Sequence, residues 1–129
     1  MGRKKRRESK MIKVIFRRKY ISRGYDDKGC EVEVILPADK EGYLVPELRD
    51  QREVVFGWEL SKTWGHYDKE TNTRYYSLKV WGFSWEEAER QADELVSGAV
   101  ETLQRVYKKN MEKLRSVPRD KEEVYVLDS

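Results

Sequence analysis

The sequence predicts an α+β domain in which a four-stranded antiparallel sheet is followed by one long C-terminal helix, in the order ββββα. Apolar residues alternate with a period of two in four stretches, as they do in strands with one buried face: 11–21, 30–36, 53–63 and 73–83. Turn-forming residues separate these stretches. A capping box and a long helical stripe follow the fourth stretch, and together the three observations fix the expected order.

The first two stretches are expected to form a hairpin, because residues 22–29 between them supply Gly and Asp for a turn. The first strand has an apolar face of Ile12, Val14 and Phe16 and a basic face of Lys13, Arg17 and Lys19. The second strand turns Val32, Val34 and Leu36 inward and Glu31 and Glu33 outward. These acids either pair with the bases of the first strand or leave the bases to contact a ligand, and both interpretations stay open.

The second half of the sheet is expected to be a long hairpin between Phe56 and Trp85, a stretch that holds all four tryptophans. Pro37 ends the preceding strand, and an irregular crossover or a short helix over 46–52 leads into the hairpin. The third strand, 53–63, has a core face of Val54, Phe56, Trp58 and Leu60. The segment 65–72 makes the turn.

The fourth strand, 73–83, divides its side chains into two sets. We expect Tyr76, Leu78 and Val80 to face the core and Tyr75, Ser77, Lys79 and Trp81 to face outward, because a core face rarely includes a lysine. Exposed flat aromatics beside a cation are the combination that binds single-stranded nucleic acid, with bases stacked on the rings. The alternative is that a helix or a second subunit covers this face.

The C-terminal helix is expected to begin at the capping box Ser84–Glu87 and to end near 116, before Pro118. Its apolar stripe has 3-4 spacing: Ala88, Ala92, Leu95, Val96, Ala99, Val100, Leu103, Val106, Tyr107, Met111 and Leu114. A helix of roughly 50 Å overhangs strands of about 30 Å. It therefore either breaks, with Gly98 as the weak point, or buries its distal half in a homodimer through Leu103, Val106, Tyr107, Met111 and Leu114.

Length and charge divide the chain into a disordered basic arm (1–10), one domain (11–116) and a tail (117–129) whose residues 122–127 alternate like a short strand. The net charge is +3, and the arm alone supplies five positive charges, from Arg3, Lys4, Lys5, Arg6 and Arg7. Such an arm favours contact with nucleic-acid phosphates over a role as a solubilising tail or a targeting signal. With 40% charged residues and few amides, the composition is typical of thermophile proteins.

A single cysteine and the lack of an apolar run of membrane-spanning length predict a soluble, cytoplasmic protein, in which association with the nucleoid is compatible with the basic arm. Few residues suit catalysis. His66 is the only histidine and is expected to be a turn residue, and Cys30 is expected to be a buried structural thiol. The glycines form no phosphate-binding loop, and the spacing of the acids does not separate a metal-dependent nuclease from a solvated surface. We expect no enzymatic activity, no metal and no cofactor.

The segment from Tyr75 to Glu87, YYSLKVWGFSWEE, and the order of elements around it resemble single-stranded nucleic-acid binders of ββββα plan, such as the Whirly and Pur-alpha groups. Together with the thermophile-like composition, this order of elements and this segment resemble the archaeal ThermoDBP family and its related proteins. The resemblance covers about 11–114. It implies a sheet packed with helices, an aromatic and basic cleft for single strands, and oligomerisation through C-terminal helices. As residue types, the cleft positions correspond to Trp58, Tyr75, Lys79 and Trp81.

The sequence therefore predicts a sequence-tolerant binder of single-stranded DNA or RNA that acts as a homodimer. Tyr75 and Trp81 are expected to stack bases, with Trp58, Trp64 and Tyr67 as further candidates. Lys13, Arg17, Lys19, Lys79 and the arm are expected to meet phosphates. A protein-protein interaction module whose aromatic face is an oligomer interface is the alternative.

Overall fold

The computed structural model describes residues 11–116, 118 and 120–128. The predicted basic arm, 1–10, lies outside these residues. The elements are β1 (Ile15–Ser22), β2 (Lys28–Pro37), the 3₁₀ helix η2 (Pro46–Leu48), β3 (Asp50–Val55), β4 (Trp58–Leu60), β5 (His66–Asp68), β6 (Thr73–Gly82) and α1 (Trp85–Ser116). No helix in this described part is both long and apolar enough to cross a membrane.

The main sheet has four strands in the order β1-β2-β6-β5, and every neighbouring pair is antiparallel. The α+β class, the four-stranded antiparallel sheet and the long terminal helix are thus confirmed. The central strand β2 pairs with β1 on one side, where Val34 faces Phe16, and with β6 on the other, where Val34 faces Tyr76. Cross-strand partners share a face of the sheet, so these three side chains lie on the same side.

The predicted long third strand is wrong, because residues 53–63 do not pair with β6. The chain turns back at Phe56 and Gly57, whose φ angles of 54° and 84° lie in the left-handed region. Positive φ at both central residues is the geometry of a two-residue hairpin turn. The hairpin β3–β4 forms a separate two-stranded sheet, and the fourth strand of the main sheet is β5, from the segment predicted to be a turn.

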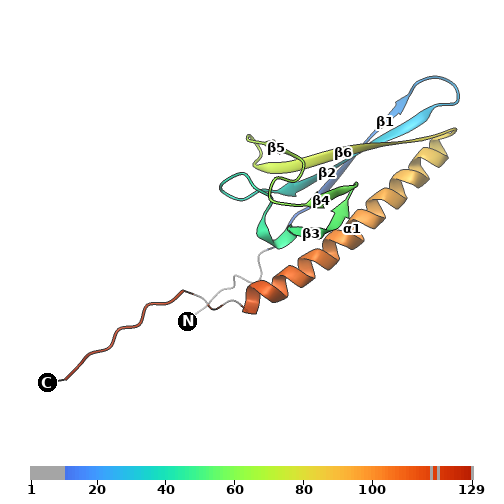
Figure 1. Ribbon diagram of the computed structural model, residues 1–129. Coiled ribbons are helices and arrows are strands. Elements are labelled where there is room, and N and C mark those ends of the chain that lie inside the picture. Colours follow the sequence, from blue (N-terminus) through green and yellow to red (C-terminus); the bar gives the residue numbers. More distant parts are fainter. Residues whose placement is uncertain (1–10, 117, 119, 129) are drawn as a thin grey trace.

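The core lies between one face of the main sheet and a layer formed by α1 and the β3–β4 hairpin (Figure 1). From the sheet it takes Cys30, Val32, Val34 and Leu36 of β2, with Phe16 of β1 and Tyr76 of β6 beside them. From the other layer it takes Val55, Leu60, Ala92, Ala99, Leu103 and Val106, and the segment before β3 adds Leu44 and Leu48. Both α1 and β3–β4 therefore cover the same face of the sheet.

The start of α1 is fixed as the capping box predicts, because the backbone N–H of Glu87 donates to Ser84 Oγ at 3.1 Å. The Trp85 ring then meets Tyr20 of β1 edge-on, with the ring centroids 6.1 Å apart. About two helical turns further on, Arg18 of β1 pairs with Asp93 at 2.7 Å. These contacts hold the first third of the helix to the edge strand of the sheet.

The distal half of α1 is covered by the chain itself, a solution that neither expected alternative included. The helix is unbroken at Gly98, and η2 and β3 pack beneath its second half. Asn110 Nδ2 donates to the backbone carbonyls of Pro46, Glu47 and Arg49 at 3.3, 3.1 and 2.8 Å. Arg105 makes two bonds to Glu53, and Lys109 pairs with Asp50.

This packing corrects part of the expected dimer surface. Leu103 and Val106 are 4% and 0% exposed within their own chain, so they are not accessible to a second copy. Tyr107 and Met111 are half-buried, and Leu114 is 44% exposed. In the tail, residues 118 and 120–128 form no strand and are exposed, and Figure 1 shows them extending away from the body.

Candidate nucleic-acid interface

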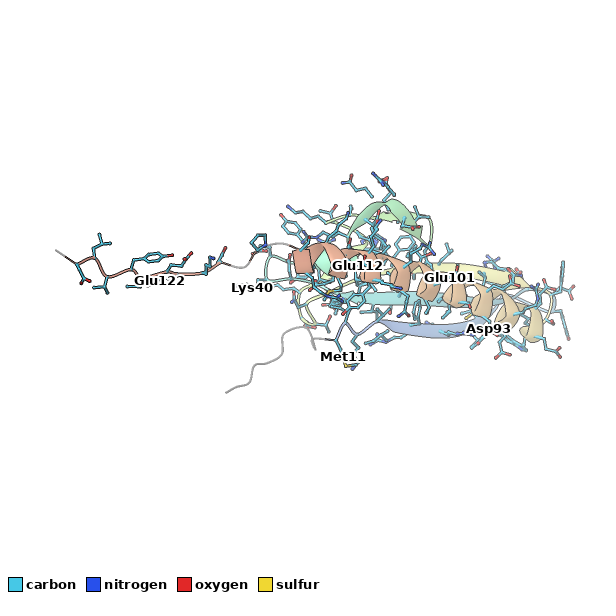
Figure 2. All side chains as sticks on the ribbon, turned by 90° about the horizontal axis from the view of Figure 1, so that it is seen from below. Met11, Lys40, Asp93, Glu101, Glu112 and Glu122 are labelled. Atoms are coloured by element: carbon cyan, nitrogen blue, oxygen red, sulfur yellow. The ribbon has the colours of Figure 1, made fainter. Side chains whose placement is uncertain are left out.

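The face of the main sheet that points away from α1 is the candidate site, and we call it the open face. Alternation along the strands places on it the side chains that precede and follow each core residue. Its residues on the three long strands are Ile15, Arg17, Lys19, Ile21, Gly29, Glu31, Glu33, Ile35, Tyr75, Ser77, Lys79 and Trp81. Figure 2 shows the molecule from below, with α1 in front of the strands, so the open face points away from the viewer.

The predicted division of β6 into two sets agrees with the register of the sheet. Tyr76 and Val80 face Val34 and Cys30 of the core, although Leu78, on the same face, is 37% exposed. Tyr75 and Trp81 face Ile35 and Gly29 on the open face. The structure therefore brings the predicted stacking residues Tyr75 and Trp81 to one surface.

Trp81 is held between two groups that anchor its ring. A Cβ added at Gly29 would lie 2.5 Å from Trp81 Cε3, so the indole rests directly against the backbone of β2. The guanidinium of Arg23 lies over the indole, with Cζ 3.8 Å from the ring centroid. Arg23 also pairs with Asp27 at 3.1 Å across the β1–β2 turn. Its location adds a cation to the open face beside the largest ring there.

Sequence reasoning missed Arg23 because it expected β6 to pair with the third strand. Only the pairing of β2 with β6 brings the β1–β2 turn next to the end of β6 where Trp81 lies. The signal in the sequence was the glycine at position 29. A strand glycine marks a place where a bulky neighbour approaches the backbone closely.

Tyr75 lies at the other end of β6, in an apolar row across the sheet. Its cross-strand partners are Ile35 of β2 and His66 of β5, and the His66 and Tyr75 ring centroids are 5.7 Å apart. Ile15 completes the row on β1. Ile35, between Ile15 and Tyr75 in this row, is only 8% exposed although it points away from the core. Tyr75 therefore lies in register with apolar neighbours on the adjacent strands.

The charged residues of the open face form two rows between the aromatics. In the first row Arg17, Glu33 and Ser77 are partners in register, and Arg17 pairs with Glu33 at 3.6 Å. In the second row Glu31 lies between Lys19 and Lys79. Ser77 Oγ donates to Glu31 Oε2 at 3.3 Å. Both interpretations of Glu31 and Glu33 therefore have support. Arg17 is paired with an acid, whereas Lys19 and Lys79 are exposed.

Three other predicted stacking residues are not on the open face. Trp58 is on β4, on the helix side of the sheet, where its ring packs on Tyr76 with centroids 4.6 Å apart. Trp64 is 1% exposed and belongs to the core. Tyr67 faces Arg74 on the helix-facing side and lies against Gly42. These placements separate the three residues from Tyr75 and Trp81, with which they were expected to stack bases. Lys13 precedes β1 and is exposed, and the arm lies outside the described residues.

Cys30, His66 and the acidic side chains are the described residues whose chemistry suits catalysis or metal binding. Burial raises the pKa of the Cys30 thiol, which disfavours the thiolate that a nucleophile requires. In the described part of the chain, no three His, Cys, Asp or Glu side chains gather closely enough to hold a metal ion. His66 is an exposed β5 residue whose ring lies near Tyr75 and Tyr76. The open face presents aromatic rings and charged side chains, which suit stacking and ion pairing.

Comparison of the chain with protein-family models, with curated proteins and with solved structures gave no match.

Proposed function

We propose that the open face binds single-stranded DNA or RNA with little sequence preference. The observation that carries this proposal is the position of Tyr75 and Trp81 on one face, which no helix or strand of the described residues covers, with Ser77 and Lys79 between them. Six residues along a strand correspond to roughly 20 Å, a length that several nucleotides of a single strand can follow. Every base has a π-face, so stacking on two such rings is tolerant of sequence.

The charges around the two rings support the same ligand. Lys19, Lys79 and Arg23 are exposed beside the aromatic residues, and Arg17 is exposed at the adjacent row. The two acids of the face, Glu31 and Glu33, lie on the central strand and are engaged with Ser77 and Arg17. The resemblance of residues 75–87 to the ThermoDBP family favours this class of ligand as well. Phosphates are then expected to run along the flanking strands β1 and β6, over their basic side chains.

The test is a titration of the full chain with fluorescent oligo-dT at about 50 and about 200 mM salt. We expect Tyr75→Ala and Trp81→Ala each to weaken binding by about 1–3 kcal/mol, which corresponds to roughly 5- to 150-fold in Kd. Trp58→Ala is the matched control, since Trp58 is 43% exposed but lies on the helix side. Lack of binding by the intact protein at the lower salt would refute the proposal.

The same variants distinguish the nucleic-acid site from an oligomer interface. Light scattering on Trp81→Ala should give the same mass as the parent chain if the open face binds nucleic acid. A loss of mass with unchanged oligonucleotide affinity would instead assign the face to protein-protein contact. Competition by duplex DNA that exceeds competition by single strands would assign it to duplex binding.

A further inference from the structure

The outer edge of β1 carries an unusual concentration of positive charge. β1 is an edge strand of the main sheet, so one row of its backbone N–H and C=O groups has no strand partner within the described part of the chain. Residues 11–22 contain four bases, Lys13, Arg17, Arg18 and Lys19, and no acid. Basic side chains on an edge discourage indiscriminate pairing. A strand rich in acids is the one that such an edge accepts.

An apolar groove of about 450 Å³ lies next to this edge. It runs between the start of β1 and the middle of α1, and its lining includes Val14, Phe16, Val100 and Tyr107. Val14 and Phe16 face the helix side of the sheet, so their side chains form the floor next to the edge. A strand added to β1 would place every second side chain over this groove.

The C-terminal tail has the complementary chemistry. Residues 120–128 contain four acids and one base, a net charge of −3. Their apolar side chains are almost fully exposed, from 77% for Tyr125 to 90% for Leu127. Along the tail the acids Glu122 and Glu123 come first and the apolar residues follow, whereas along β1 the apolar residues come first and the bases follow. The two orders match when the strands are antiparallel.

We propose that residues 122–128 of a second copy of this chain add to the edge of β1 as an antiparallel strand. One register pairs acids with bases and, apart from Val124 with Arg17, apolar residues with apolar residues: Glu122 with Lys19, Glu123 with Arg18, Val124 with Arg17, Tyr125 with Phe16, Val126 with Ile15, Leu127 with Val14, and Asp128 with Lys13. Tyr125 and Leu127 then lie on the face of Phe16 and Val14 and enter the apolar groove. Main-chain bonds supply affinity and the groove supplies selectivity.

The length of the chain excludes the tail of the same copy from this register. Arg18 is beside Asp93 of α1, and Ser116 lies 23 helical residues beyond Asp93, a distance of roughly 35 Å. Glu123 follows Ser116 by seven residues, which reach at most about 25 Å when fully extended. Glu123 therefore cannot return to Arg18 of its own chain. Two copies that exchange their tails satisfy both edges at once.

Disulfide trapping between two differently tagged chains tests both the partner and the register. One full chain carries Ile15→Cys and the other carries Val126→Cys, and the native Cys30 is buried in each. We expect a covalent heterodimer under mild oxidation. Tyr125→Cys is the matched control, because in this register its side chain lies on the opposite face from Ile15, and it should cross-link much less. Equal trapping of both pairs, or no heterodimer, would overturn the proposal.

Sedimentation velocity of the full chain without nucleic acid gives a second test. We expect a species of twice the 15.5 kDa chain mass, and Leu127→Asp should raise its dissociation constant at least about tenfold. Glu122→Lys or Lys19→Glu alone should weaken the dimer, and the doubly exchanged chain should regain it. A monomeric parent chain, or a dimer that Leu127→Asp leaves unchanged, would contradict tail exchange. Neither result affects the oligonucleotide titration, which tests the proposed nucleic-acid site separately.

Discussion

The indole of Trp81 lies against its cross-strand partner Gly29 so closely that even a methyl group at position 29 would come within 2.5 Å of the ring. The glycine therefore sets the height at which the ring stands above the sheet. Arg23 lies over the same ring, at 3.8 Å from Cζ to the centroid. Position 29 controls the geometry of the proposed platform without being part of its contact surface.

Gly29→Ala should therefore weaken oligonucleotide binding through displacement of Trp81. We expect a loss in affinity that approaches that of Trp81→Ala, about 1–3 kcal/mol, together with a change in tryptophan fluorescence. Gly98→Ala is the control: a Cβ there meets nothing within 4 Å, and the helix should gain up to about 1 kcal/mol. If Gly29→Ala binds oligo-dT as tightly as the parent chain, the position of the Trp81 ring does not matter for binding.

Arg23→Ala should reduce the salt dependence of binding. When a base stacks on Trp81, the guanidinium must move off the ring, and a phosphate of the same nucleotide is the nearest expected partner. Loss of one phosphate contact lowers the magnitude of the log-log salt slope by about 0.7 for single strands. Binding measured at four salt concentrations gives this slope. Arg52→Ala, which removes an exposed arginine on β3, should leave the slope unchanged.

The sequence was sufficient to predict the faces of β1, β2 and β6, because alternation is a local property that the pleat of a strand enforces. It was not sufficient to break the third strand. Val54, Phe56, Trp58 and Leu60 keep a period of two through the turn at Phe56 and Gly57, whereas the two-residue turn reverses the parity. Val55 pairs with Trp58, so Val55 is buried, and Val54, which was expected to face the core, is 50% exposed. Phe-Gly is also not among the pairs that mark such turns, so Trp58 was assigned to the wrong sheet.

The helix was predicted to within a residue at its start and at its end, since its cap and its 3-4 spacing are local signals. What covers its distal half was not predictable in the same way. Asn110 breaks the apolar pattern, and only the fold of residues 44–60 reveals why a buried amide stands there. The burial of Leu103 and Val106 in the core of their own chain likewise depends on contacts with residues that are distant in sequence.

Asn110→Ala should destabilise the protein by about 1–3 kcal/mol. The variant leaves the carbonyls of Pro46, Glu47 and Arg49 without the amide that now donates to them, and Asn110 is only 8% exposed. Chemical denaturation followed by far-ultraviolet circular dichroism gives the change in free energy of unfolding. Gln104→Ala, at an exposed position of the same helix, is the control. A variant as stable as the parent chain would show that these carbonyls find other donors.

The stability of the protein should decrease in acid through two ion pairs between α1 and β3. The hydrogen bond from Lys109 lowers the pKa of the Asp50 carboxyl, and that from Arg105 lowers the pKa of Glu53. A carboxyl whose pKa is lower in the folded state takes up protons first in the unfolded chain. Its contribution is therefore complete above the ordinary carboxyl pKa of about 4 and is lost as the pH falls through the folded value.

The expected outcome is a free energy of unfolding that is steady between about pH 5 and pH 7 and falls at lower pH. Asp50→Asn and Glu53→Gln should each lower the free energy of unfolding at neutral pH and make its decline in acid shallower, because the group that gains the proton is gone. Asp26→Asn removes an exposed carboxylate in the β1–β2 turn and serves as the control. An acid limb that stays equally steep in both variants would assign the proton uptake to other carboxyls. In that case the pairs of Asp50 and Glu53 would fix the position of β3 under the helix without contributing to the pH dependence.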